Sequence, residues 1–159
     1  MTDTSIEARR NVLPRAVRLL SAAIAWLEAI PYWVLAIPLR LAVAWIFWNS
    51  AQVKLLNWSA ALAMFQDEYR VPLLPPEFAA HLTLAIELTT PVLLVLGLLT
   101  RPAILVLLGM VAVIEAFVYP EAWPTHLQWS AMMLVLLCRG AGALSLDHLL
   151  WRWLAPGLR

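Results

Sequence analysis

Ionisable residues interrupt the long apolar stretches of this sequence, and they are the side chains most able to carry chemistry. Arg40 lies inside the first stretch, Lys54 near its end, and Glu87 inside the second, while Glu115 and His126 lie near the ends of two later ones. A charge at the centre of a bilayer costs roughly 2.5–3.5 kcal/mol on insertion scales, so it normally has a partner or a function. We take these five residues as candidates for binding a small molecule, and no catalytic residue is assigned.

The spacing of these residues predicts which of them meet. Arg40 and Glu87 each lie about eight residues into their stretch from opposite sides, roughly 12 Å at 1.5 Å per residue, which predicts an ion pair between them. Arg40, Phe47 and Lys54 are seven residues apart and share one helix face. Glu115 is expected within reach of Lys54, so that a polar cluster forms in the outer half of the protein.

Three interpretations of this cluster remain open on the sequence alone. The charges could fix the register of the helices, hold the polar head of a small molecule such as a quinone, or conduct protons or ions. His81 and His126 are weak candidates for a metal site, because both lie at the outer ends of apolar stretches. Haem or copper ligation is disfavoured, since histidines at helix ends are more often interfacial.

Composition places the chain in a membrane. Of its 159 residues 63% are hydrophobic and only 13% are charged, against about 45–50% and 25% in soluble domains. No run of Lys and Arg suited to nucleic acid is present. Cys138 is the single cysteine, which excludes an internal disulfide and a CxxC redox pair.

Four apolar stretches are each close to the ~20 residues that cross a ~30 Å hydrocarbon core. They cover residues 32–50, with an extension as far as 57, then 78–99, 103–119 and 126–144, and a short helix is expected at 59–65. The sequence therefore predicts an all-α integral membrane four-helix bundle. Before it, residues 12–30 show the spacing of an amphipathic helix that lies on the membrane surface.

The basic residues predict orientation. With the N-terminus in the cytoplasm, eight arginines fall on the cytoplasmic side and only Lys54 and Arg70 on the other. Both termini are therefore expected in the cytoplasm of a bacterium, with the protein in its inner (plasma) membrane. Residues 1–30 form a cytoplasmic segment with the amphipathic helix, 31–150 the four-helix domain, and 151–159 a cytoplasmic tail.

Several of these residues resemble the DoxX family of small four-helix bacterial membrane proteins. The resemblance is carried by Arg40 and Phe47, by Lys54 with the leucine after it, by Glu87, and by the run LVLGLLTR at 94–101. Ala51 stands where family members often have glycine, which keeps a small residue there. The amphipathic segment is not part of the usual pattern.

The resemblance implies a place in membrane redox systems, with Arg40, Lys54 and Glu87 as site residues. One branch of the family is a subunit of a thiosulfate:quinone oxidoreductase, and others are linked to oxidative or metal stress. A quinone would need donors such as Lys54 or His126. Its ring would need aromatic walls, for which the sequence offers Phe47, Trp48 and Trp129.

The first functional hypothesis is thus an accessory subunit that interacts with quinone or serves a stress response. It requires the lipid bilayer and a protein partner in a redox complex, and it allows a homo-oligomer but no nucleic acid. A small transporter or metal-handling protein is the first alternative, and a non-catalytic membrane scaffold is the second. Whether the protein is an enzyme is left open, because family membership alone fixes no reaction.

Overall fold

The computed structural model describes residues 15–69 and 74–154. Every long element in these ranges is an α-helix, and no strand occurs in them. The chain divides into two units, Met1–Pro31 and Tyr32–Arg159, which are treated separately.

The first unit contains helix α2 (Arg15–Glu28). Val17, Leu20, Ile24 and Leu27 follow one another at helical spacing, and none of the residues of α2 is buried. The amphipathic helix predicted at 12–30 is therefore confirmed over 15–28. Its position on a membrane surface stays a prediction, and residues 12–14 lie outside the described ranges.

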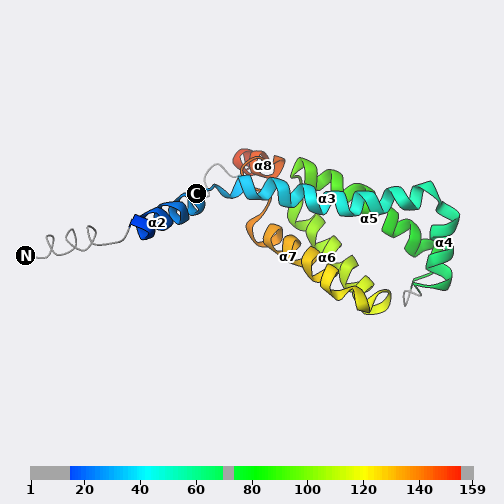
Figure 1. Ribbon diagram of the computed structural model, residues 1–159. Helices are drawn as coiled ribbons and strands as arrows, with labels where there is room; N and C mark the ends of the chain where they lie inside the picture. The colour runs from blue at the N-terminus through cyan, green and yellow to red at the C-terminus, as the bar shows by residue number, and fades with distance from the viewer. Residues whose placement is uncertain (1–14, 70–73, 155–159) are drawn as a thin grey trace, which may run out of the picture. The chain divides into compact units, whose positions relative to one another are not determined.

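The second unit holds the remaining helices (Figure 1). In chain order these are α3 (Tyr32–Leu56), α4 (Trp58–Asp67), α5 (Pro76–Leu96), α6 (Thr100–Phe117), the short 3-10 helix η1 (Pro120–Ala122), α7 (Trp123–Arg139) and α8 (Leu146–Leu154). Three of them, α3, α5 and α6, are long and apolar enough to cross a membrane. The all-α membrane bundle predicted from composition is therefore confirmed.

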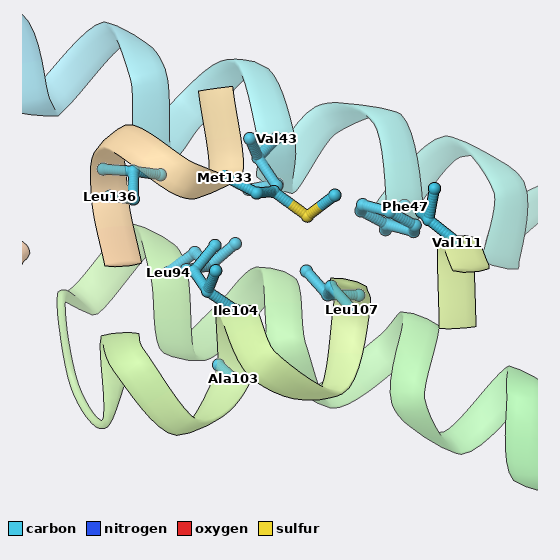
Figure 2. Packing of buried hydrophobic residues seen from close by; sticks show 10 residues of the cluster. Val43, Phe47, Leu94, Ala103, Ile104, Leu107, Val111, Met133 and Leu136 are labelled. Carbon is cyan, nitrogen blue, oxygen red and sulfur yellow. The ribbon is translucent and has the colours of Figure 1, made fainter. Parts of the chain in front are cut away.

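Two pairs of helices build this unit. α3 packs along α5, and α6 packs along α7, and the two pairs diverge toward the end that carries α4 (Figure 1). Side chains from all four helices, among them Val43, Leu94, Leu107 and Met133, fill the core where the pairs meet (Figure 2). Because the core lies where the pairs are close together, the diverging end has room for a cavity.

The α5–α6 connection lies three residues earlier than the sequence suggested. α5 ends because Gly97 takes a left-handed conformation, with φ of 64°. Leu99 also has a positive φ, and α6 begins at Thr100. We expected the turn at 100–102, but Pro102 lies in the first turn of α6, where its missing N–H costs nothing.

α7 differs from the expected fourth span at both ends. It begins at Trp123 and ends at Arg139, because Gly140 departs from helical geometry with φ of 77°. With 17 residues it is about 25 Å long, somewhat short of a ~30 Å core. It is not among the three helices long and apolar enough to cross a membrane, so the fourth span stays a prediction.

Two short helices flank the spans. The helix expected at 59–65 is confirmed as α4, which starts after Asn57 because that side chain accepts a hydrogen bond from the backbone N–H of Ala60. α8 was not expected from the sequence, and it runs across the predicted boundary between the four-helix domain and the C-terminal tail.

Candidate functional site

Lys54 and Glu87 form an ion pair between α3 and α5. The Lys54 ammonium donates to both carboxylate oxygens of Glu87, at 2.9 and 2.8 Å, and to Ser50 Oγ at 2.9 Å. The Ser50 hydroxyl in turn donates to Glu87 at 3.0 Å. Only 4% of the Glu87 side chain and 15% of the Lys54 side chain are exposed. Each charge has therefore lost most of its contact with water, and the attraction of its partner offsets that loss.

Small side chains allow α3 and α5 to approach closely along this pair. Ala44 and Ala51 are buried on α3, on the face that carries Lys54, whereas Ala79 and Ala80 of α5 pack with Phe65 of α4. Helices in membranes pack most closely where such residues line the contact. The face of α3 that carries Lys54 is therefore lined by small residues where α3 packs along α5.

A cavity of about 340 Å³ lies against the pair, between the diverging helix pairs. This volume is within the ~300–1,000 Å³ typical of small-molecule sites. Its walls are mostly aliphatic and aromatic, and they come from α3, α5, α6 and α7 together with the end of the α4 segment. The polar side chains among them are Ser50, Lys54, Tyr69, Thr83, Glu87, Tyr119 and His126.

His126 lies on the opposite wall and has its own acidic partner. Its Nδ1 atom is hydrogen-bonded to the Glu115 carboxylate, which links α7 to α6. The imidazole is buried and packs edge-on against Trp129, with ring centroids 5.4 Å apart. Glu115 therefore orients His126. The sequence had suggested that Glu115 approaches Lys54, but the acidic partner of Lys54 is Glu87, and Glu115 does not line the cavity.

Aromatic residues cover much of the cavity. Of the three expected on its walls, Phe47 and Trp129 line it and pack edge to face at 6.0 Å, whereas Trp48 does not line it and is 38% exposed. At the end of the bundle that carries α4, called the outer end after the predicted orientation, Tyr69 packs against Tyr119, at 5.6 Å between ring centroids. Apolar walls around one charged pair suit a ligand with a flat ring and few polar atoms.

The outer tyrosines also provide hydroxyl groups. Tyr119 donates to Glu68 at 2.9 Å, and its oxygen lies 3.4 Å from that of Tyr69. Burial raises the pKa of Tyr69 well above its ordinary value, so this phenol keeps its proton at pH values where a free phenol would lose it. Neither tyrosine was singled out from the sequence, and their only signal was their position at the outer ends of two helices.

Arg40 does not pair with Glu87, which corrects the central expectation drawn from the sequence. Its guanidinium donates to four backbone carbonyl oxygens at the end of the bundle that carries the α5–α6 turn, called the inner end after the predicted orientation, at 2.6–3.0 Å. These acceptors belong to Leu94, Val95, Ala141 and Leu144. The last carbonyls of α5 have no partner within the helix, and a cation at a helix C-terminus is also favoured by the helix dipole.

The direction of side chains explains why the depth estimate failed. Side chains on a helix lean toward its N-terminus. α3 begins at the inner end, so Arg40 leans inward, whereas α5 begins at the outer end, so Glu87 leans outward. Two residues at similar depth therefore point apart, and Glu87 meets Lys54, which leans inward from the outer end of α3.

Asp147 completes the structure at the inner end and was missed in the sequence-based prediction. Its carboxylate accepts the N–H groups of Leu99 and Thr100, at 2.7 and 2.9 Å, and so caps the start of α6. The sequence does contain a signal for α8, the helix that carries Asp147. Ser145 precedes the apolar residues of α8 and caps this helix by accepting the N–H of His148. Arg40 and Asp147 thus hold the α5–α6 turn and α8 together.

His81 lies apart from this cavity. It is exposed on α5, its Nδ1 lies 2.8 Å from the carbonyl oxygen of Glu77, and its ring packs against Trp58 at 4.7 Å between centroids. Within residues 15–69 and 74–154, no three His, Cys, Asp or Glu side chains come together in a way that could hold a metal. The structure therefore brings Lys54, Glu87 and His126 to one cavity and leaves Arg40 and His81 outside it.

The fold and cavity define a small all-α membrane protein with a charged pair facing an apolar hollow. The model of the DoxX family matches residues 35–120, which include Arg40, Lys54, Glu87 and Glu115, and the chain belongs to this family. It is 32% identical over 124 residues to an uncharacterized protein of Haemophilus influenzae, covering 70% of this chain and 80% of the relative. No solved structure matches the chain.

Proposed function

We propose that the cavity binds the head of a membrane quinone, and that the protein serves as an accessory subunit of a membrane redox system. The observation that carries this proposal is the Lys54–Glu87 pair, which presents ammonium and carboxylate groups to a cavity that is otherwise mainly apolar. A quinone has the matching chemistry, because a flat apolar ring carries two carbonyl oxygens that accept hydrogen bonds.

The roles of the residues follow from their positions. Lys54 donates to one carbonyl oxygen of the quinone, while Phe47 and Trp129 pack against its ring. His126, held by Glu115, is placed to donate to the second carbonyl or to take up a proton. Reduction to quinol requires two electrons and two protons, and in this proposal the electrons come from a protein partner in the redox complex.

The orientation of the protein belongs to the same proposal. The excess of arginine on one side supports a cytoplasmic N-terminus and C-terminus in the inner membrane, which places the Lys54 cavity in the half away from the cytoplasm. Reporter fusions after Arg101 and at the C-terminus should read cytoplasmic, and fusions near Pro75 and Glu121 should read external. A reversed reading at any of these positions would refute the topology.

Ligand binding is tested with the purified full chain in lipid nanodiscs. A quinone that binds only the folded protein raises its unfolding temperature increasingly as the ligand concentration exceeds the dissociation constant, and decylubiquinone is the probe. We expect this rise in the wild type, and we expect its loss in the Lys54→Met, Glu87→Leu double variant, which removes both charges together.

The matched control is His81→Gln, a polar change on the same helix as Glu87 but outside the cavity. It should leave the quinone response unchanged. If decylubiquinone does not stabilise the wild type, or stabilises the double variant equally, the pair is a structural link between α3 and α5 and the quinone proposal fails.

A further inference from the structure

The cavity has an opening between α5 and α6. Four of its lining residues are exposed at this edge, namely Leu82 on α5 and Val106, Gly109 and Val113 on α6. The three side chains among them are 42%, 45% and 37% exposed, although each also lines the cavity. The cavity is therefore continuous with the outside of the bundle along this edge.

Gly109 lies at the middle of this opening. It is the tenth of the 18 residues of α6, about 14 Å from the start of the helix. A Cβ placed on Gly109 would meet no atom within 4 Å. The backbone of α6 therefore forms the edge of the opening, and no side chain fills the space in front of it.

The depth of the opening determines what lies outside it. α6 is one of the three helices able to cross a membrane, and its middle falls at the level of the hydrocarbon chains. A cavity that opens at this depth connects with acyl chains, not with water. A molecule with a hydrocarbon tail can move through such an opening, whereas a water-soluble one must use another way in.

The charged pair and the opening lie on the same cavity, at a distance that one amphiphile can span. Leu82 and Glu87 are five residues apart on α5, which corresponds to about 7.5 Å along the helix. A polar head bonded to Lys54 thus leaves its tail directed to the gap beside Gly109.

On the basis of the proposed function, we infer that the ligand is a tailed lipid quinone that reaches the Lys54–Glu87 pair directly from the bilayer, between α5 and α6. Gly109 keeps the path of the tail clear. The tail remains among the acyl chains while the head occupies the cavity, so the site selects for tailed over tail-less molecules.

The test compares two probes on variants of the full chain in nanodiscs. The probes are decylubiquinone, with its concentration expressed per lipid, and the tail-less dimethoxy methyl benzoquinone. Gly109→Phe places a ring in the opening, and Val106→Trp is a second blocking variant in case the first does not fold. Leu105→Phe adds similar bulk to an exposed residue of α6 that does not line the cavity.

We expect Gly109→Phe and Val106→Trp to weaken decylubiquinone binding by roughly tenfold or more and binding of the tail-less probe by less than about twofold. Leu105→Phe should change neither. Equal losses for the two probes would overturn the tail path while leaving quinone binding intact. If the wild type binds neither probe, both the tail path and the proposed function are refuted.

Discussion

Removing Lys54 or Glu87 singly should cost far more stability than removing both. In Lys54→Met, the Glu87 carboxylate remains 4% exposed and keeps only the hydroxyl of Ser50 as a donor. Breaking a buried ion pair in this way costs about 3–5 kcal/mol, because a charge is left without its partner in a medium of low dielectric. Glu87→Leu should cost a similar amount, since the Lys54 ammonium is then the unpaired charge.

The double variant recovers much of this loss. Replacing both charges with apolar residues of similar volume leaves no orphan group, so its unfolding free energy should lie within about 1–2 kcal/mol of the wild type. The sum of the two single losses then exceeds the double loss by roughly 4 kcal/mol or more, and this excess measures the coupling between the residues. The assay is denaturant unfolding of the purified protein in micelles, followed by circular dichroism.

A second cycle on the same helices provides the control. Arg40 bonds backbone carbonyls at the inner end and has no hydrogen bond to Glu87. Arg40→Lys and Glu87→Leu should therefore add, within about 0.5 kcal/mol. Additive losses in the Lys54 cycle, or strong coupling in the Arg40 cycle, would refute the pairing of Glu87 with Lys54.

Three further predictions concern the turn at the inner end and the outer tyrosines. Gly97→Ala should destabilise the protein by about 2–4 kcal/mol, because the new Cβ would lie 2.5 Å from Cβ of Ser145 and the backbone φ of 64° is strained for alanine. Gly109→Ala, whose new Cβ would meet no atom within 4 Å, is the control in the same unfolding assay. Asp147→Ala should weaken the cap of α6 by about 1 kcal/mol and speed proteolytic cleavage of α8, while unchanged cleavage would show that the cap does not hold that helix. The pKa of Tyr69 is raised, so its contribution to stability is fully present below pH 10 and is lost as the pH rises toward the higher pKa of the folded state. Ultraviolet titration of the wild type and of Tyr69→Phe should show one phenol that ionises well above pH 10. Ionisation of Tyr69 near pH 10 would contradict this prediction.

Composition and periodicity were sufficient to predict every helix of the described residues that is ten residues or longer. The apolar stretches, the short helix after Asn57 and the amphipathic segment all appear in the structure near the predicted residues. Their ends were less predictable, because they depend on single residues such as Gly97 and Gly140 that take positive φ. α8 escaped notice because its cap at Ser145 was not considered.

The side-chain partners could be predicted only in part. Heptad spacing correctly placed Lys54 on the face of α3 that meets α5, and the position of Glu87 inside an apolar stretch identified it as a buried charge. Depth alone could not choose between Arg40 and Lys54 as the partner of that charge, because antiparallel helices direct their side chains oppositely. The Glu115–His126 pair could not be predicted without the packing of α6 against α7, which brings the two side chains together.

The residues that resemble the DoxX family form two groups, one that stabilises the inner end of the bundle and one that lines the cavity. Arg40 and the run at 94–101 belong to the inner end, where the guanidinium bonds the last carbonyls of α5 beside Gly97. Phe47, Lys54 and Glu87 belong to the outer cavity. Because the inner group holds α3, α5 and α8 in place and touches no cavity wall, its variants should lower stability first and quinone binding only as a consequence. An Arg40 variant that stays folded yet no longer binds decylubiquinone would therefore show that the inner end, too, takes part in the function.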